Sequence, residues 1–258
     1  IMNRDKQGYI TDTDNPKPVV ETADVKDANT IFDFVGIYVP REVPGAYALK
    51  WQCGGDSILR IVKPRLEPLS GYGAPVAIPP RGKPLSIITG NGGGRWYNQY
   101  GEAFIENPDY RHILVDGING HLTFYMFQSQ YARSNATSEI RNSRNITIFG
   151  VKGEGVVPIL WIRDSDYIRI FGYGGNAAPL GDHSIFKIEN VPNFIITNAI
   201  DHPRFDVKDA DILAGPGRHP SEWSIITEIT CDKKVIKTTP FDRPVVYKRG
   251  EPNVFDSN

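Results

Sequence analysis

The chain contains 258 residues, with 29 basic and 30 acidic side chains and a formal net charge of −1. This balance excludes the strong overall field that holds nucleic acid or an anionic membrane surface, and we expect neither as a partner. The longest purely apolar run, Val156–Ile162, is much shorter than the roughly 20 residues that span a bilayer. The 25 glycines, the 20 prolines and the lack of a long apolar pattern of helical period predict one soluble domain made mostly of β-strands.

The chain changes character near residue 29. Residues 1–28 are polar and charged and are expected to form an extended lead-in to a single domain over residues 29–258. Segments rich in β-branched and aromatic residues then predict three strands, at Thr30–Val39, Ala48–Cys53 and Ser57–Val62. The many prolines and glycines of Gly71–Pro84 predict a long surface loop, because proline cannot donate the hydrogen bond that a central strand needs.

Two glycine-rich segments carry aromatic residues. After a short expected strand at Leu85–Thr89, the segment Gly90–Trp96 predicts a loop. Trp96 is a candidate for stacking on a sugar ring, and packing beneath the loop is the alternative. Gly172–Pro179 predicts a turn that approaches a neighbour or a sugar closely, with Tyr173 available for stacking.

The second half of the chain repeats itself. Segments that start at positions 145, 167 and 193 read NITIFG, YIRIFG and NFIITN, at spacings of 22 and 26 residues. This alignment gives three apolar columns, Ile140/Ile162/Ile188, Ile146/Ile168/Phe194 and Ile148/Ile170/Ile196. A weaker member lies 24 residues upstream, where Leu122 and Phe124 take the places of Ile146 and Ile148.

Repeats of about 20 to 30 residues built from short strands are typical of solenoids, whose coils bury their apolar faces by stacking. The segments are rich in Ile and Phe and have no helical half, which disfavours a leucine-rich horseshoe. We therefore predict an all-β fold, a right-handed parallel β-helix with long surface loops and the three columns as interior stacks. The clearest coils are expected at 110–201. Strands at Trp223–Ile229 and Val245–Tyr247 would form a last coil or a C-terminal cap over 215–258.

A resemblance to a known superfamily is carried by three segments, Ser138–Gly150, Leu160–Asn176 and Phe186–Asn198. They resemble coils of the pectate-lyase-like β-helix superfamily, which includes polysaccharide lyases, glycoside hydrolases and phage depolymerases. The likeness covers about the middle third of the chain and is architectural, because the paired Asp-Asp step of polygalacturonase-like hydrolases is missing. It implies a polysaccharide or oligosaccharide partner and cleavage of glycosidic bonds by a hydrolase or a lyase. The alternative is a non-catalytic module for glycan binding, adhesion or assembly with another chain.

The same alignment places polar residues in columns, where a linear polymer would lie. One column contains Gln130, Glu154, Asn176 and His202, and Lys152 and Asp201 lie beside it. For hydrolysis, Glu154 is the candidate general acid and Asp201 or His202 the partner base. For β-elimination, His202 or Lys152 would take the C5 proton of a uronate while Arg204 neutralises its carboxylate. The candidate substrate contacts are Asn176, Tyr173, Arg204, Gln130 and Trp96.

A second polar column, Asn142/Asp164/Asn190, falls where each strand should turn. Asn and Asp tolerate a left-handed backbone and bond to nearby backbone groups, so a structural side-chain ladder is expected here. Asp164 and Asp166 are weak candidates for a calcium site, because two carboxylates fall short of the about 6 to 8 oxygen ligands that Ca²⁺ takes.

The two cysteines, Cys53 and Cys231, lie far apart and neither belongs to a C-x-x-C motif, which disfavours structural zinc. A disulfide between them and two buried thiols are both open alternatives. Sequons at Asn135 and Asn145 are compatible with the secreted, extracellular location that we expect. The chain starts with Ile-Met-Asn and has no basic and apolar leader, as expected of a mature chain or a fragment of a larger protein.

Overall fold

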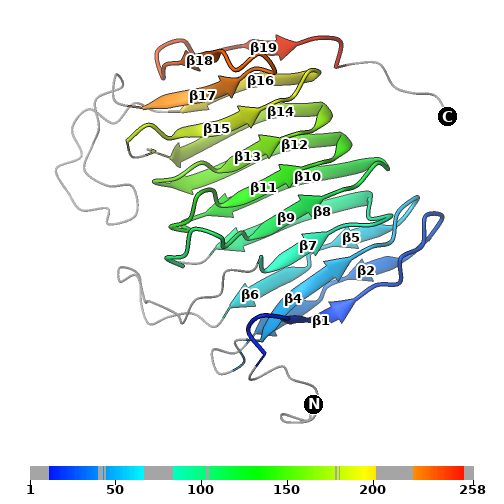
Figure 1. The fold of residues 1–258 in the computed structure, drawn as a ribbon. Coiled ribbons are helices and arrows are strands. Elements are labelled where there is room, and N and C mark those ends of the chain that lie inside the picture. Colours follow the sequence, from blue (N-terminus) through cyan, green and yellow to red (C-terminus); the bar gives the residue numbers. More distant parts are fainter. Residues whose placement is uncertain are drawn as a thin grey trace.

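The computed structural model describes residues 12–39, 43, 45–66, 84–102, 105–177, 179, 181–201 and 223–252. These residues form 19 strands and no helix, and nearly all neighbouring strands are parallel. The coils stack in chain order as a solenoid of about six turns (Figure 1). The predicted all-β parallel solenoid is therefore confirmed. With no helix in the described residues, none there has the length and hydropathy needed to cross a membrane.

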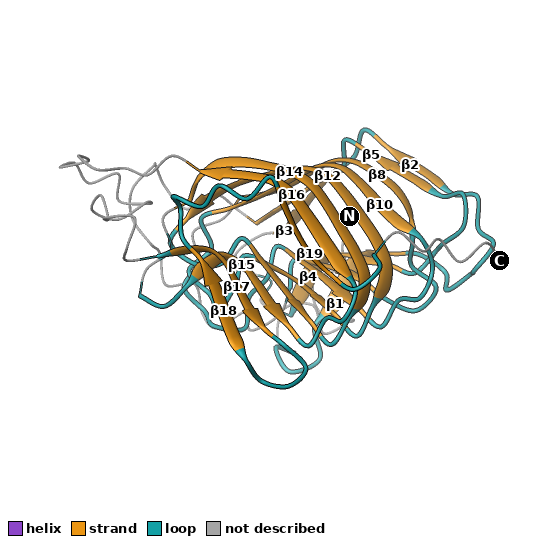
Figure 2. Ribbon diagram, turned by 90° about the horizontal axis from the view of Figure 1, so that it is seen from above, coloured by secondary structure: helices purple, strands orange, loops and turns teal. Residues whose placement is uncertain are grey.

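Two large sheets form opposite walls of the solenoid (Figure 2). The first has nine strands, in the order β1 (Lys17–Glu21), β4 (Ala46–Trp51), β7 (Ser86–Ile88), β9 (Ile113–Asp116), β11 (Ser138–Arg141), β13 (Leu160–Arg163), β15 (Ser184–Glu189), β17 (Ser224–Ile229) and β18 (Val235–Thr238). The second has eight strands, in the order β2 (Ile31–Asp33), β5 (Ile58–Arg60), β8 (Gly94–Glu102), β10 (Leu122–Gln130), β12 (Arg144–Gly155), β14 (Asp166–Ala177), β16 (Phe194–Asp201) and β19 (Val246–Arg249). A short third sheet pairs β3 (Gly36–Val39) with β6 (Lys63–Leu66). From β7 to β17 the chain alternates between the two walls.

The repeat found in the sequence sets the register of both walls. Ile140 pairs with Ile162, and Ile162 with Ile188, in the nine-stranded sheet. The other two apolar columns pair in the eight-stranded sheet as predicted, and their upstream members Leu122 and Phe124 join them. Each of these side chains is at most 1% exposed. Burying a side chain of this size contributes about 1.5 to 3 kcal/mol, so the confirmed stacks are the main source of stability.

The strands of the eight-stranded wall turn a corner at one residue with positive φ in each coil. Seven residues in register have φ between 49° and 87°: Phe34, Ile61, Asn98, Met126, Gly150, Gly172 and Asn198. The corner shifts the alternation of side chains by one position. Phe149 therefore points outward before the corner, whereas Val151 points into the core after it. One left-handed residue per coil thus gives the solenoid its cross-section.

The turn that follows each strand of the nine-stranded wall is a side-chain ladder. Asn142, Asp164 and Asn190 have φ values of 50°, 47° and 54°. The Asn190 amide donates to the Asp164 carboxylate at 2.8 Å, and the Asn142 amide donates to Asp116 at 3.1 Å. The predicted turn ladder is confirmed.

Two segments expected to be irregular are partly strand. β8 begins at Gly94, where a Cβ would lie 2.3 Å from the Ser57 carbonyl oxygen, so only glycine fits at this position. The prediction of a loop at Gly90–Trp96 is therefore wrong for its last three residues. The expected turn at Gly172–Pro179 is wrong as well, since β14 continues through its corner glycine to Ala177.

Parallel stacking stops at the C-terminal end, where β18 and β19 pair antiparallel with β17 and β16. The interior columns end here in polar side chains: Glu228 follows Ile188, Tyr247 follows Ile196 and Arg249 follows Phe194. These last three side chains bond to one another instead of leaving an apolar surface uncovered.

The two cysteines are both free thiols, with Cys53 buried and Cys231 exposed. No disulfide links them.

Candidate functional site

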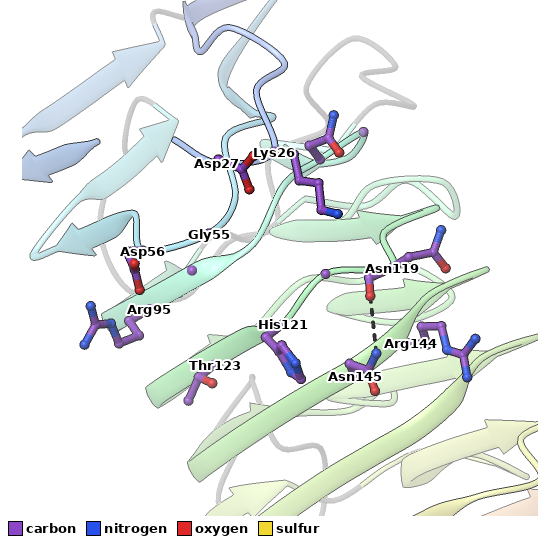
Figure 3. Close-up of a pocket in the computed structure, with 14 residues that line it drawn as sticks. Lys26, Asp27, Gly55, Asp56, Arg95, Asn119, His121, Thr123, Arg144 and Asn145 are labelled. Atoms are coloured by element: carbon purple, nitrogen blue, oxygen red, sulfur yellow. Dashed lines mark hydrogen bonds between the residues drawn. The ribbon is translucent and has the colours of Figure 1, made fainter. Parts of the chain in front are cut away.

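An open groove runs across the turns between the two walls, on the side where the nine-stranded wall leads into the eight-stranded wall (Figure 3). It encloses about 910 Å³. Its lining comes from five successive passes of the chain: Lys26, Asp27, Gly55, Asp56, Gly90, Asn91, Gly94, Arg95, Asn119, Gly120, His121, Thr123, Arg144 and Asn145. The groove therefore crosses the coils in the direction in which they stack.

The lining is polar throughout. It contains amides, a hydroxyl, charged groups and glycine backbone, with no aliphatic side chain and no Phe, Tyr or Trp. The backbone comes to the surface at several glycines, and around Gly120 no atom lies within 4 Å of the place a Cβ would occupy. The polar side chains of this surface suit a ligand rich in hydroxyl or ionic groups.

Hydrogen bonds hold the amides of the groove in place. The Asn91 backbone and side-chain amides donate to the Asp24 carboxylate at 2.8 and 2.9 Å, and these bonds keep the pKa of Asp24 below its usual value. The Asn145 side chain donates to the Asn119 carbonyl oxygen at 3.2 Å, the contact drawn in Figure 3. The side-chain oxygens of Asn91 and Asn145 are positioned as acceptors, so the site is organised before any ligand arrives.

The charged groups of the groove are unevenly distributed along the solenoid. Lys26, Asp27 and Asp56 come from the first two passes of the chain, whereas Arg95, His121 and Arg144 come from the next three. Among the described residues none of the last three makes an ion pair within 4.0 Å. The groove is therefore mixed in charge at one end and basic at the other.

Arg144 packs against an aromatic ring. Its guanidinium carbon lies 5.2 Å from the centre of the Tyr167 ring, a cation–π contact that orients the side chain without using its N–H groups. The buried Nε of Arg144 has no hydrogen-bond partner in the described structure.

The polar column predicted from the sequence is in register, but it lies elsewhere. Gln130 pairs with Glu154, and Glu154 with Asn176, at the far ends of β10, β12 and β14. Glu154 accepts hydrogen bonds from the Tyr131 hydroxyl and from the Lys152 ammonium. The Glu154 and Lys152 side chains are 21% and 36% exposed and Asn176 is exposed, so a polymer on the outer surface would reach all three.

Asp201 and Tyr173 belong to the interior instead. Asp201 pairs with Gly175 on an inward row, is 1% exposed, and accepts a hydrogen bond from the Tyr173 hydroxyl at 2.6 Å. Burial raises the pKa of Tyr173 well above its usual value, and the charge of Asp201 and, more weakly, that of Glu154 add to this rise. The Tyr173 hydroxyl thus lies within electrostatic reach of both carboxylates.

Two further residues that were predicted to contact substrate are buried. Trp96 is 0% exposed and packs edge-on against Trp51 and Phe124, so of the two alternatives for this ring the core position is correct. Gln130 is 3% exposed, and its backbone carbonyl oxygen lies 2.6 Å from Nε2 of the His112 ring, within hydrogen-bonding distance. The remaining candidates, His202 and Arg204, lie outside the described residues.

The proposed calcium ligands already have protein partners. Asp164 accepts from Asn190, and Asp166 accepts from the backbone of Tyr167 and from Asn193 at 3.0 and 2.9 Å. No group of three or more His, Cys, Asp or Glu side chains suited to a metal ion occurs in the described ranges.

A row of aromatic rings runs along the outer face of the eight-stranded wall, next to the corner. Tyr97, Tyr125, Phe149 and Phe171 stack with centroids 4.7 to 5.4 Å apart and planes within 19° of parallel. Because each ring face covers the next, only the edges are open. A sugar needs a free ring face to stack on, so we assign this row to the stability of the coils.

The outer face of the nine-stranded wall carries a ladder of paired charges. Glu139 is 3% exposed and accepts from Arg111 at 2.9 Å and from Arg163 at 2.8 Å. Burial lowers the pKa of Arg111, partly offset by the charge of Glu139. Trp161 lies beneath Arg163, whose guanidinium carbon is 4.8 Å from the centre of the indole ring. The ladder ties β9, β11 and β13 together and has its charges satisfied internally.

The sequence did not indicate the groove residues, because they do not recur at equivalent positions of successive coils. Arg95, His121 and Arg144 occupy different positions of their coils, so no column connects them. A usable signal was present for Arg95, which precedes Trp96. Extending the apolar column from Phe124 to Trp96 would have placed Arg95 on an outward position of a strand.

Comparison with protein families, with characterised proteins and with solved structures finds no match to this chain. Its function is therefore argued from its own residues.

Proposed function

We propose that the solenoid binds a polysaccharide that lies along the groove, across the coils. The observation that carries this proposal is the wholly polar lining contributed by five passes of the chain. Amide, hydroxyl and charged groups match the hydroxyl groups of a sugar, and the exposed glycine backbone lets a chain approach closely. The resemblance of three coils to the pectate-lyase-like superfamily also favours a carbohydrate polymer.

The shape of the groove favours a polymer over a compact ligand. Adjacent coils are separated by about 4.8 Å, so five passes extend over about 19 Å, the length of several sugar units. Successive units of an extended chain would meet successive coils. Affinity is then expected to increase with the length of the oligosaccharide until the groove is filled.

Gly120 offers a direct test, because its surroundings are empty and its φ is not positive. Gly120→Gln places a side chain in the groove without disturbing the protein, and it should abolish binding to the polysaccharides that the unaltered protein retains in affinity electrophoresis. Gly36→Gln is the matched control, because Gly36 is also open but lies on β3, away from the groove. If both variants bind as the unaltered protein does, the ligand does not lie in the groove.

Cleavage of a polysaccharide, at a second site apart from the groove, is a second proposal that is supported by one observation. Glu154 and Lys152 form an accessible pair of opposite charges, with the Tyr131 hydroxyl on the same carboxylate. As a charged pair, the Glu154 carboxylate can accept a proton, from water in a hydrolase or from C5 of a uronate in a lyase, and the Lys152 ammonium can donate a proton to the glycosidic oxygen. Buried Asp201 would act from the interior, through Tyr173.

The test of cleavage separates the two reactions from inactivity. A polysaccharide panel is incubated with the protein while reducing ends and the ultraviolet absorbance of an unsaturated uronate product are followed. Glu154→Gln and Lys152→Gln should abolish turnover and leave the thermal midpoint nearly unchanged, whereas Asp201→Asn should lower both. Turnover that persists in Glu154→Gln and Lys152→Gln rules out this site. Product from none of the substrates leaves a binding module for glycan recognition, adhesion or assembly.

An extracellular location belongs to the same proposal, because polysaccharides long enough to fill the groove are met outside the cell. Fractionation of the native host checks it, and recovery of the protein only from the cytoplasm would contradict it.

A further inference from the structure

We propose that the ligand of the groove is a polyanionic polysaccharide, bearing carboxylate or sulfate groups, whose charged units lie at the basic end. The inference rests on the proposed function and names its substrate class. It starts from a cation in each of three successive passes of the chain: Arg95 on β8, His121 just before β10 and Arg144 on β12.

These cations are not tied up by the fold. The described residues offer Arg95 and His121 no hydrogen-bonding or ionic side-chain partner, and both side chains are exposed. Among the described residues, the Arg144 guanidinium packs on the face of Tyr167 and forms no ion pair. The outer face of the nine-stranded wall differs, because Arg163 is paired there with Glu139 and Arg141 with Asp116. The groove therefore presents positive charge that a ligand can meet.

The spacing of the cations favours a polymer over a single anion. In Figure 3 the side chains of Arg95, His121 and Arg144 spread along the groove and do not converge on one point. A small anion could meet one of them at a time. A chain with repeated charges would meet all three, one for each coil.

Two carboxylates lie at the end of the groove that also holds Lys26, and they give the groove a direction. Asp27 and Asp56 are likewise unpaired in the described part of the chain and belong to the first two passes. Like charges repel, so these carboxylates disfavour anionic units at their end and favour hydroxyl groups there. Removing the acidic charges should therefore strengthen polyanion binding, while removing the basic charges weakens it.

Nucleic acid is the other linear polyanion, and the lining disfavours it. Proteins that bind single strands stack the bases on aromatic side chains. The described lining of the groove holds no Phe, Tyr or Trp, and Arg144 packs on the face of the nearby Tyr167 ring. Amides and Thr123 instead present partners for hydroxyl groups.

The experiment compares polymers that share a backbone and differ in charge. Affinity electrophoresis of the full chain is run in gels that contain dextran, dextran sulfate, polygalacturonate or its methyl ester, with a single-stranded oligothymidylate in parallel. We expect the protein to bind a charged polymer at least about tenfold more tightly than its neutral counterpart. Binding to the charged polymer should weaken at high salt. The sulfate and carboxylate arms identify which anion the groove takes.

Three variants locate the effect. Replacing Arg95, His121 and Arg144 together by Gln should weaken polyanion binding about tenfold or more, and should weaken binding to the neutral polymer much less. Replacing Lys233, Lys234 and Lys248 by Gln alters the net charge similarly at the C-terminal end and should change nothing. Asp27→Asn with Asp56→Asn should tighten polyanion binding severalfold.

Each result bears on one proposal. Equal binding of charged and neutral polymers, unaffected by the groove variants, overturns the polyanion inference and leaves polysaccharide binding intact. Retention of no polysaccharide at all overturns the proposed function itself. Oligothymidylate bound as tightly as the best polysaccharide, and lost in the triple Gln variant, replaces the carbohydrate with nucleic acid as the ligand.

Discussion

The Glu228 carboxylate accepts two hydrogen bonds from the Arg249 guanidinium, at 2.7 and 2.9 Å, and a third from Tyr247 at 2.5 Å. Glu228 is nearly buried, with 3% of its side chain exposed, whereas the Arg249 side chain is 42% exposed. Hydrogen bonding to Glu228 raises the pKa of Arg249, so Arg249 stays charged. This cluster closes the C-terminal end of the interior columns.

Glu228→Gln should therefore lower the free energy of unfolding by about 1 to 2 kcal/mol, because a buried acceptor loses its charge while Arg249 can still turn to water. Urea denaturation measures the change. Glu251→Gln, an exposed neighbour whose side chain bonds to no described residue, should stay within about 0.5 kcal/mol. Equal effects of the two substitutions would show that the cluster does not hold the end closed.

His112 should make the protein sensitive to mild acid. Burial lowers its pKa from 6.5 to about 4, and the neutral ring is held by the Tyr110 hydroxyl and the Gln130 carbonyl. Between these two values the unfolded chain binds a proton that the folded protein does not. Stability is therefore lost as the pH falls through this window, by about 3 kcal/mol in total.

Denaturation measured between pH 7 and pH 4 checks the effect. His112→Gln keeps a donor for the Gln130 carbonyl but cannot titrate, so its stability should depend less on pH over that range. His121→Gln, at an exposed histidine, should retain the full dependence. An unchanged pH profile in His112→Gln would contradict the assignment.

The backbone at Gly153 packs closely against the Ile159 side chain, so that a Cβ at Gly153 would lie 2.6 Å from a side-chain carbon of Ile159. Gly153→Ala should destabilise the protein by about 1 to 3 kcal/mol through overpacking. Gly174 is the matched control, since it lies on the neighbouring strand and has no atom within 4 Å of a Cβ. Gly174→Ala should be nearly neutral in the same denaturation assay, and a cost as large as that at Gly153 would rule out the steric explanation.

Met126 adopts a φ of 65° at the corner of β10, although its side chain is 48% exposed and adds little packing. A left-handed backbone costs a residue with a Cβ about 1 kcal/mol relative to glycine. Met126→Gly should accordingly be more stable than Met126→Ala by about that amount, because both lose the side chain and only glycine relieves the strain. Thermal and urea denaturation of the pair test this, and an alanine variant as stable as the glycine variant would exclude backbone strain at the corner.

The sequence reveals most where stacking forces neighbouring coils to repeat one residue type. Ile140, Ile162 and Ile188 share one environment, so a single alignment identified the columns and the register together. Asn142 and Asn190 repeat for a similar reason, because each turn needs a residue that tolerates positive φ.

The groove and the buried polar groups could not be found in this way. Arg95, His121 and Arg144 come from different positions of their coils and meet only through the turns between the walls. Trp96 was misplaced because the glycines before it are typical of a loop, whereas here they let β8 pass close to Ser57. Asp201 reads like a surface residue in the sequence, and only the register turns it inward.

The corners and turns also decide where the protein can change in length. The turn from the nine-stranded to the eight-stranded wall takes six residues in three coils, from Ile140 to Ile146, from Ile162 to Ile168 and from Ile188 to Phe194. The difference between the coils of 22 and 26 residues falls instead on the return path, which is longer after Ile170 than after Ile148. In these coils one side keeps its length and the opposite side accepts insertions. A loop can be lengthened on the return path without moving the turns on the side that carries the groove.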